Sequence, residues 1–182
     1  MVVFAGDHGL VARGVSAYPS EVTWQMVENY LAGGAAICVL ARQHGLALTV
    51  VDCGVNHDFL SEGQTSRPGL MVKKVANGTA DSFAEPAMTL AQCHEAINNG
   101  YEVVKSLPGN VLLVGEMGIG NTSAAALLLA RLAELDIADC AGAGAGLDNV
   151  GLDRKIKVLS QVLQRHSYAA GPIAALTAFG GF

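Results

Sequence analysis

The segment from Val111 to Ser123 constrains the fold of this chain more than any other. Its four apolar residues predict a short buried strand over Val111–Val114, and a bend with three glycines follows. An alanine- and leucine-rich helix is expected from Asn121 or Thr122 to about Leu135. Glycines let the backbone approach a ligand, and the start of a helix offers free N–H groups and the positive end of the helix dipole. The segment therefore predicts a site for an anion.

One carboxylate, Glu116, is expected inside that bend, and an acid beside a phosphate loop favours chemistry on a phosphorylated sugar. The glycines are Gly115, Gly118 and Gly120, a spacing that does not match the G-x-G-x-x-G fingerprint of dinucleotide-binding proteins. No lysine follows Gly120, which disfavours a P-loop ATPase. The remaining alternative is a tight turn between a strand and a helix that binds no ligand.

Strand-like apolar runs alternate with helical patterns along the chain. The predicted strands cover Val2–Phe4, Ala47–Val51 and Val111–Val114. The predicted helices cover about Ser20–Leu31, Gly34–His44, Ala87–Leu107, Thr122–Leu135, Leu152–His166 and Pro172–Phe179. This alternation predicts an α/β fold in which helices cover both faces of a parallel sheet, a three-layer αβα arrangement. We interpret residues 1–182 as one domain of ordinary size.

Ligands of such sheets bind at the carboxyl ends of the strands. Each predicted strand ends there in a short turn, at Gly6–Gly9, Asp52–Gly54 and Gly115–Gly118, so the three turns should converge. Two of these regions also hold side chains that can bind a metal, namely Asp7, His8, Asp52, His57 and Asp58. Their spacing matches no metal motif, and aspartates that stabilise turns are commoner, so we predict no metal site.

The stretch Asn56–Ala84 shows little periodicity, and we expect a long loop over the sheet edge with a short hairpin around Leu70–Val75. A second glycine loop, Gly142–Gly146, precedes a helix that carries Lys155. Its N–H groups and that lysine could together hold one phosphate. The alternative is a flexible connection followed by a basic helix face exposed to solvent.

The start of the first long helix offers a candidate pocket for an aromatic ligand. Tyr18, Trp24, Gln25 and Met26 lie close together there, and the Gln25 amide could hydrogen-bond a ring nitrogen. Spacing alone favours the alternative, an amphipathic helix with a partly buried Trp24.

The composition excludes several classes of protein. Apolar residues make up 51% of the chain and charged residues 15%, which indicates a folded protein with a substantial core. The net charge of −5 offers no basic surface for nucleic acid or an anionic membrane. No apolar stretch reaches the ~20 residues of a membrane span. The four cysteines form no C-x-x-C pair, which favours reduced thiols in the cytoplasm over zinc or disulfides.

The two ends of the sequence are unusual for a complete domain. The first residues read at once as a strand and lack the charged region of a signal peptide. The last residues, from Phe179 to Phe182, look like the middle of a bend. We therefore expect a fragment of a longer protein.

Several motifs occur together in one order. They read Ala5-Gly-Asp-His-Gly, Gly14-Val-Ser-Ala-Tyr-Pro-Ser-Glu-Val-Thr, Gln25-Met-Val, Leu31-Ala-Gly-Gly-Ala-Ala-Ile, Glu85-Pro-Ala-Met-Thr, Gly115-Glu-Met-Gly-Ile-Gly-Asn-Thr, Gly146-Leu-Asp with Arg154-Lys155, and Gly180-Gly-Phe. In combination, over essentially the whole chain, they resemble the family of nicotinate-nucleotide–dimethylbenzimidazole phosphoribosyltransferases.

The resemblance implies a transferase of cobalamin (vitamin B12) nucleotide-loop synthesis. Such an enzyme moves the phosphoribosyl group of nicotinate mononucleotide to 5,6-dimethylbenzimidazole, and it releases nicotinate and α-ribazole 5′-phosphate. It also implies a Rossmann-like sheet, a homodimer, and no metal or organic cofactor. The residues that resemble the family's nucleotide-phosphate site are Glu116, in an auxiliary catalytic role, with Gly118, Gly120, Asn121, Thr122, Gly144 and Lys155. Those that resemble its benzimidazole pocket are Ser16, Tyr18, Gln25 and Met26.

The sequence departs from the family pattern in three respects. It lacks the family's mostly helical N-terminal part and its C-terminal third. The second glycine loop commonly reads Gly-Arg-Gly-Thr-Gly in the family and reads Gly142-Ala-Gly-Ala-Gly here, which lowers the expected phosphate affinity. The family's proposed general base is a glutamate in a Leu-Gly-Glu-Gly-Thr-Gly-like segment that this sequence lacks. We therefore expect a nucleotide-binding core that is weakly active or inactive alone. The alternatives are a non-catalytic binding remnant and, less favoured, a metal-dependent hydrolase built on the Asp and His side chains named above.

Overall fold

The computed structural model describes all residues from Met1 to Phe182. Its strands are β1 (Val2–Gly6), β2 (Thr49–Gly54), β3 (Leu70–Val72) and β4 (Val114–Met117). Its helices are α1 (Glu21–Leu31), α2 (Ala36–Gln43), α3 (Leu90–Ser106), α4 (Asn121–Ala133), α5 (Ile137–Cys140), α6 (Asn149–Arg165) and α7 (Pro172–Phe179), with a 3₁₀ helix, η1, at Gly9–Arg13. No helix is long and apolar enough to cross a membrane.

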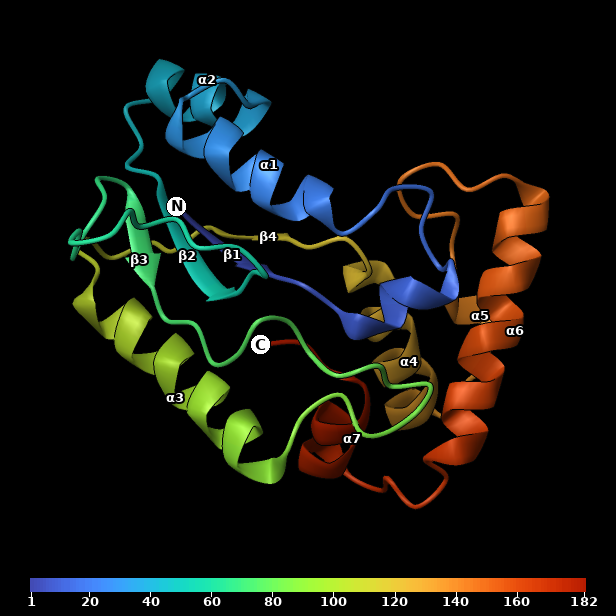
Figure 1. The fold of residues 1–182 in the computed structure, drawn as a ribbon. Helices are drawn as coiled ribbons and strands as arrows, with labels where there is room; N and C mark the ends of the chain where they lie inside the picture. Colours follow the sequence, from blue (N-terminus) through green and yellow to red (C-terminus); the bar gives the residue numbers. More distant parts are fainter.

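The four strands form one sheet in the order β3-β2-β1-β4, and all neighbouring pairs are parallel. Side chains alternate between the two faces of the central strand β1. Val2 packs on one side with Val103 of α3, and Ala5 packs on the other side with Val27 of α1. Figure 1 shows α1 and α3 on opposite sides of the sheet. The predicted three-layer α/β fold is therefore confirmed.

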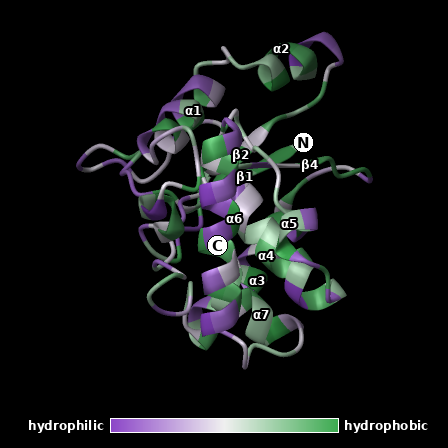
Figure 2. Ribbon diagram, turned by 90° about the vertical axis from the view of Figure 1, so that its right-hand side faces the viewer, coloured by the Kyte–Doolittle hydropathy of each residue, from purple (hydrophilic) through white to green (hydrophobic).

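The largest core cluster lies beside the sheet, among the helices of the second half of the chain. It joins buried residues of α4, α6 and α7, including Leu127, Leu159 and Phe179. Figure 1 places α4, α5 and α6 together at one end of the sheet, and Figure 2 shows hydrophobic residues along α4. This helical part carries the start of α4 to the carboxyl ends of β1 and β4.

The strand predicted over Val111–Val114 is wrong in position and in burial. Val111 is 77% exposed and Val114 is 67% exposed, and the strand β4 begins only at Val114. The register explains this shift, because Val114 pairs with Val2 at the start of β1. β4 is also an edge strand, so one side of the apolar run before it borders solvent, although Leu113 still accepts from the Val2 amide of β1.

Other predicted boundaries also change. The hairpin expected around Leu70–Val75 is wrong, because β3 pairs parallel with β2 and forms no hairpin. α3 begins at Leu90 and not near Ala87, since Thr89 caps it and accepts from the Gln92 amide. α6 begins earlier than predicted, at Asn149, where the Asp148 side chain caps it. The short elements α5 and η1 were not predicted, because their apolar patterns are too short to show a period.

Candidate active site

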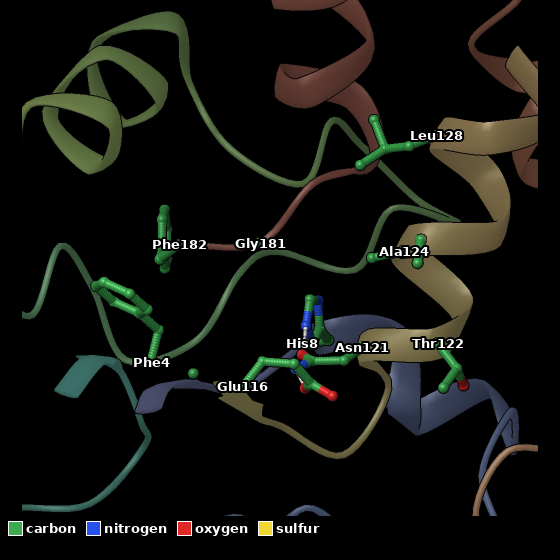
Figure 3. A pocket seen from close by; sticks show the side chains of 11 residues that line it. Phe4, His8, Glu116, Asn121, Thr122, Ala124, Leu128, Gly181 and Phe182 are labelled. Atoms are coloured by element: carbon green, nitrogen blue, oxygen red, sulfur yellow. Dashed lines mark hydrogen bonds between the residues drawn. The ribbon is translucent and has the colours of Figure 1, made fainter. Parts of the chain in front are cut away.

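The sheet order makes β1 the point where the topology changes direction. β2 pairs with one side of β1 and β4 with the other. In open α/β sheets such a point opens a crevice at the carboxyl ends of the strands, where ligands bind. A cavity of 370 Å³ lies there (Figure 3). Its lining residues are Phe4, Gly6, His8, Glu116, Asn121, Thr122, Ala124, Ala125, Leu128, Gly181 and Phe182.

The three predicted turns converge at this edge. The Asp7 amide donates to the Gly54 carbonyl oxygen at 3.0 Å, which joins the turns after β1 and β2. A Cβ atom on Gly118 would lie 2.3 Å from the Gly6 carbonyl oxygen, so the turn after β4 needs a glycine to approach β1. The predicted convergence is confirmed.

Glu116 lies in β4 and not in the bend, which corrects the sequence-based placement. It pairs with Phe4 of β1, and its side chain lines the cavity (Figure 3). Asn121, the first residue of α4, donates a hydrogen bond from Nδ2 to Glu116 Oε2. His8 Nε2 lies 2.5 Å from Asn121 Oδ1. These three side chains form one connected polar wall of the cavity.

His8 is only 8% exposed, and this burial lowers its pKa below the ordinary value of 6.5. The hydrogen bond to Asn121 and the nearby charges of Asp7 and Glu116 act in the opposite direction and are outweighed. A lowered pKa keeps the imidazole neutral at physiological pH. The polar wall therefore holds the Glu116 carboxylate next to a neutral His8, with no positive charge on the imidazole.

The glycine bend before α4 leaves three amides without an acceptor. Gly120 has φ of 101°, a conformation that side chains rarely adopt, and it turns the backbone into α4. The N–H groups of Gly118, Gly120 and Thr122 donate to no acceptor in the chain. The Ile119 N–H, in contrast, donates to Thr23 Oγ1 of α1 at 3.0 Å. Those of Gly120 and Thr122 lie at the start of a 13-residue helix and are available to a ligand there.

Lys155 of α6 is fully buried beside this bend, so the predicted alternative of a solvated basic face is wrong for this residue. Its Nζ donates to Thr122 Oγ1 and to the Gly142 carbonyl oxygen, each at 3.0 Å, and no carboxylate pairs with it. Burial lowers the pKa of Lys155 below 10.5. A buried ammonium without a counter-ion is unfavourable, and one of its three donors remains free. Both facts favour an anion at this position.

Gly144 of the second glycine loop borders the same point. A Cβ atom there would lie 3.2 Å from Thr122 Oγ1 and 3.7 Å from Lys155 Nζ. Thr122 itself lines the cavity, so it connects the lysine with the polar wall. The structure thus brings the residues of the predicted phosphate site together, which are Glu116, Gly118, Gly120, Asn121, Thr122, Gly144 and Lys155.

The four residues predicted to bind the aromatic base lie apart from this cavity. The loop between η1 and α1 carries Ser16 and Tyr18, and α1 carries Gln25 and Met26. None of these four residues lines the cavity. Tyr18 is 49% exposed. The neighbouring Trp24 already has an aromatic partner, because its ring stacks on His57 with centroids 4.6 Å apart.

An apolar wall faces the polar one and was missed in the sequence. It consists of Phe4 of β1 and Phe182, the last residue of the chain, whereas Leu128 lines the cavity from α4, the helix that also carries Asn121. Figure 3 shows Phe4 and Phe182 close to each other across the cavity from Asn121. Only their place in the fold brings them together, so no sequence motif could have marked them.

The candidate metal ligands are engaged in other contacts. Asp52 accepts from the amides of Gly54 and Val55 and pairs with Lys74 at 3.4 Å. His57 stacks on Trp24. No group of three or more His, Cys, Asp and Glu side chains is arranged to hold a metal ion.

Comparisons with known proteins agree on one family. A family model described as phosphoribosyltransferase matches residues 1–182. Proteins named nicotinate-nucleotide–dimethylbenzimidazole phosphoribosyltransferase are 66% identical in Variovorax paradoxus and 56% identical in Dechloromonas aromatica, and each match covers 100% of this chain. The crystal structure of CobT from Thermus thermophilus matches 99% of the chain with a TM-score of 0.88 and 41% identity.

The match is complete for this chain and partial for its relatives. It covers 51% and 53% of the two relatives and 54% of the Thermus thermophilus chain, so the chain spans about half of their length. The family model, the identities and the fold nevertheless agree over every part of the sequence. The chain belongs to the nicotinate-nucleotide–dimethylbenzimidazole phosphoribosyltransferase family.

Proposed function

We propose that this chain holds the nucleotide substrate of a phosphoribosyl transfer in cobalamin synthesis, from nicotinate mononucleotide to 5,6-dimethylbenzimidazole. One observation carries the proposal. Lys155 is buried without a counter-ion and donates to Thr122, and Thr122 lines the same cavity as Glu116. The relatives' shared name supplies the identity of both substrates.

The 5′-phosphate of the nucleotide is proposed to bind between Lys155 and the start of α4. The free N–H groups of Gly120 and Thr122 and the third donor of Lys155 offer hydrogen bonds to its oxygens. Gly144 leaves room for the phosphate because a side chain there would contact both Thr122 and Lys155. Holding the phosphate fixes the ribose relative to the cavity, and positioning of this kind contributes on the order of 7–11 kcal/mol to a transfer reaction.

The cavity walls suit the reacting rings. The nicotinate ring of the nucleotide is a pyridinium cation, which the Glu116 carboxylate stabilises, while Phe4 and Phe182 offer an apolar surface to a flat ring. A benzimidazole nitrogen forms the new bond to the anomeric carbon from the opposite side. The old bond breaks with its electron pair on the nicotinate nitrogen, the configuration inverts, and the other benzimidazole nitrogen releases its proton to water.

We propose that the benzimidazole is held by the loop and helix that carry Ser16, Tyr18, Gln25 and Met26. A buried contact between this region and the bend before α4 supports the proposal. Thr23 of α1 accepts from the Ile119 N–H, so the first turns of α1 are fixed to the bend that precedes α4.

A homodimer in the cytoplasm belongs to the same proposal. All four cysteines are free thiols, and three of them are buried, which suits a reducing compartment. Sedimentation equilibrium of the purified chain would measure the assembly; a single species with the mass of the monomer would contradict the homodimer.

A calorimetric titration of the chain with nicotinate mononucleotide, which measures the dissociation constant, tests the proposal. We expect Lys155→Met to weaken binding by at least tenfold, because it removes the only buried cation at the phosphate. Lys157→Met is the matched control, since Lys157 lies on the same helix and is exposed. Equal affinities for the two variants would contradict the phosphate site.

Turnover is measured separately. The chain is incubated with nicotinate mononucleotide and dimethylbenzimidazole, and α-ribazole 5′-phosphate is followed by chromatography. Glu116→Gln should lower any turnover, while binding of the nucleotide is weakened but stays measurable. Binding without product in the unmodified chain would indicate a non-catalytic binding protein.

A further inference from the structure

The polar wall of the cavity contains a chain of two hydrogen bonds whose direction can be worked out. An ionised carboxylate only accepts hydrogen bonds, so Glu116 must receive the Asn121 Nδ2 group. This fixes the orientation of the Asn121 amide and turns its Oδ1 toward His8. His8 must then donate from Nε2, and because its pKa is lowered by burial it does so as the neutral Nε2–H tautomer.

We propose that His8 is a positioning residue that fixes, through Asn121, the direction in which the Glu116 carboxylate faces the cavity. His8 itself touches no reacting group in this arrangement. Without its N–H, the Asn121 amide would be held by Glu116 alone, so the amide and the carboxylate could shift together in the cavity. The inference rests on the proposed function in one point, which is that a Glu116 carboxylate held in one direction stabilises the bound nucleotide.

Three glycines surround this pair and leave no space for other residues. A Cβ atom on Gly118 would lie 2.4 Å from Asn121 Oδ1, and one on Gly120 would lie 3.1 Å from His8 Cβ. A Cβ atom on Gly181 would lie 2.7 Å from His8 Cε1. A side chain at any of these positions would displace the ring or the amide, so the backbone of two separate segments, the bend before α4 and the end of the chain, is shaped around the two hydrogen bonds.

The position of His8 in the chain also suits a positioning role. It lies two residues after the end of β1 and is the residue before η1, so its backbone is held between the central strand of the sheet and a short helix. Asn121 begins α4, whose inner face is buried in the largest core cluster. Two rigid elements thus hold the two ends of the contact, as the geometry of a precise site requires.

The first test needs no ligand. The side-chain amide protons of Asn121 are assigned by NMR from their loss in Asn121→Asp. We expect their shifts to differ from those of an exposed asparagine in the unmodified chain, to approach exposed values in His8→Leu, and to be retained in His8→Gln, whose amide N–H can replace Nε2–H. His94→Leu is the control, because His94 is exposed on α3. Unchanged Asn121 signals in a folded His8→Leu protein would overturn the inference.

The second test measures coupling between His8 and Glu116 through the affinity for nicotinate mononucleotide. We expect His8→Leu and Glu116→Gln each to weaken binding by roughly tenfold, and the double variant by roughly tenfold as well, because both changes remove the same interaction. If the double variant instead bound roughly a hundredfold more weakly, the two changes would act independently, and the inference would be overturned. Absence of binding by the unmodified chain would contradict the proposed function, whereas the amide signals would still report on His8 and Asn121.

Discussion

The two ends of β4 behave in opposite ways although they belong to one short segment. At the amino end, Val111 and Val114 are apolar and mostly exposed along an open sheet edge. At the carboxyl end, Asn121 and the glycine bend make close contacts with β1. The difference teaches that hydropathy does not decide burial here. Both ends pair with β1, so burial depends on what lies beyond that pairing, which is solvent at the amino end and the turn after β1 at the carboxyl end.

The largest expected effect comes from removing the close approach at the carboxyl end. Gly120→Ala places a Cβ at φ of 101°, 2.8 Å from Val11 Cγ2. Strain and overpacking together should lower the free energy of unfolding by about 2–4 kcal/mol. Urea unfolding measures this. Gly142→Ala is the control, because nothing lies within 4 Å of its Cβ position. Similar losses of unfolding free energy in both variants would show that the backbone at Gly120 does not lie tightly against Val11.

The second prediction separates stability from binding at the same end. Lys155→Met removes a buried ammonium that has no counter-ion, so the free energy of unfolding without ligand should not fall. Affinity for nicotinate mononucleotide should fall by at least tenfold. Urea unfolding measures the stability of the variant, and calorimetric titration measures its affinity for the nucleotide. A variant that loses stability and keeps affinity would mean that Lys155 holds the glycine loop in place and does not hold the phosphate.

Prediction from the sequence succeeded in finding residues that meet in the fold. The glycines of the bend, the start of a helix and the lysine after a second glycine loop marked a candidate phosphate site, and the structure places Thr122, Gly144 and Lys155 together. That phosphate binds there stays a prediction. Prediction failed where the outcome depends on register and on neighbours along the sheet. Glu116 was expected in a bend because the apolar run before it looked like a complete strand, yet pairing starts only opposite Val2.

The cavity's apolar wall could not be predicted for a related reason. Phe4 and Phe182 lie at opposite ends of the sequence, and only the turn after α7 returns the chain to β1. The contact between His8 and Asn121 likewise spans 113 positions. Their residue types carry no pattern that favours this pairing over others, so it emerges only once the sheet order is known.

The third prediction concerns pH and distinguishes the buried end from the exposed one. Because burial lowers the pKa of His8 below its ordinary value of 6.5, the unfolded chain binds more protons than the folded chain as pH falls past 6.5. The contribution of His8 to stability is therefore present above pH 6.5 and lost as pH falls below it. Unfolding of His8→Gln should depend less on pH in this window. An unchanged pH dependence would place the titrating group elsewhere.

The smallest effect is expected at the amino end, and it is the sharpest check on the comparison. Val111→Ser changes a residue that is 77% exposed, so the free energy of unfolding should change by less than about 0.5 kcal/mol. Val2→Ala is the matched change on the paired strand, where the side chain is 1% exposed, and it should cost about 2 kcal/mol. An open apolar edge also favours association between chains, so Val111→Ser should reduce any concentration-dependent growth in mass seen by light scattering. If Val111→Ser instead destabilised the chain as much as Val2→Ala, the run before β4 would be packed against another part of the protein in solution, and its two ends would not differ.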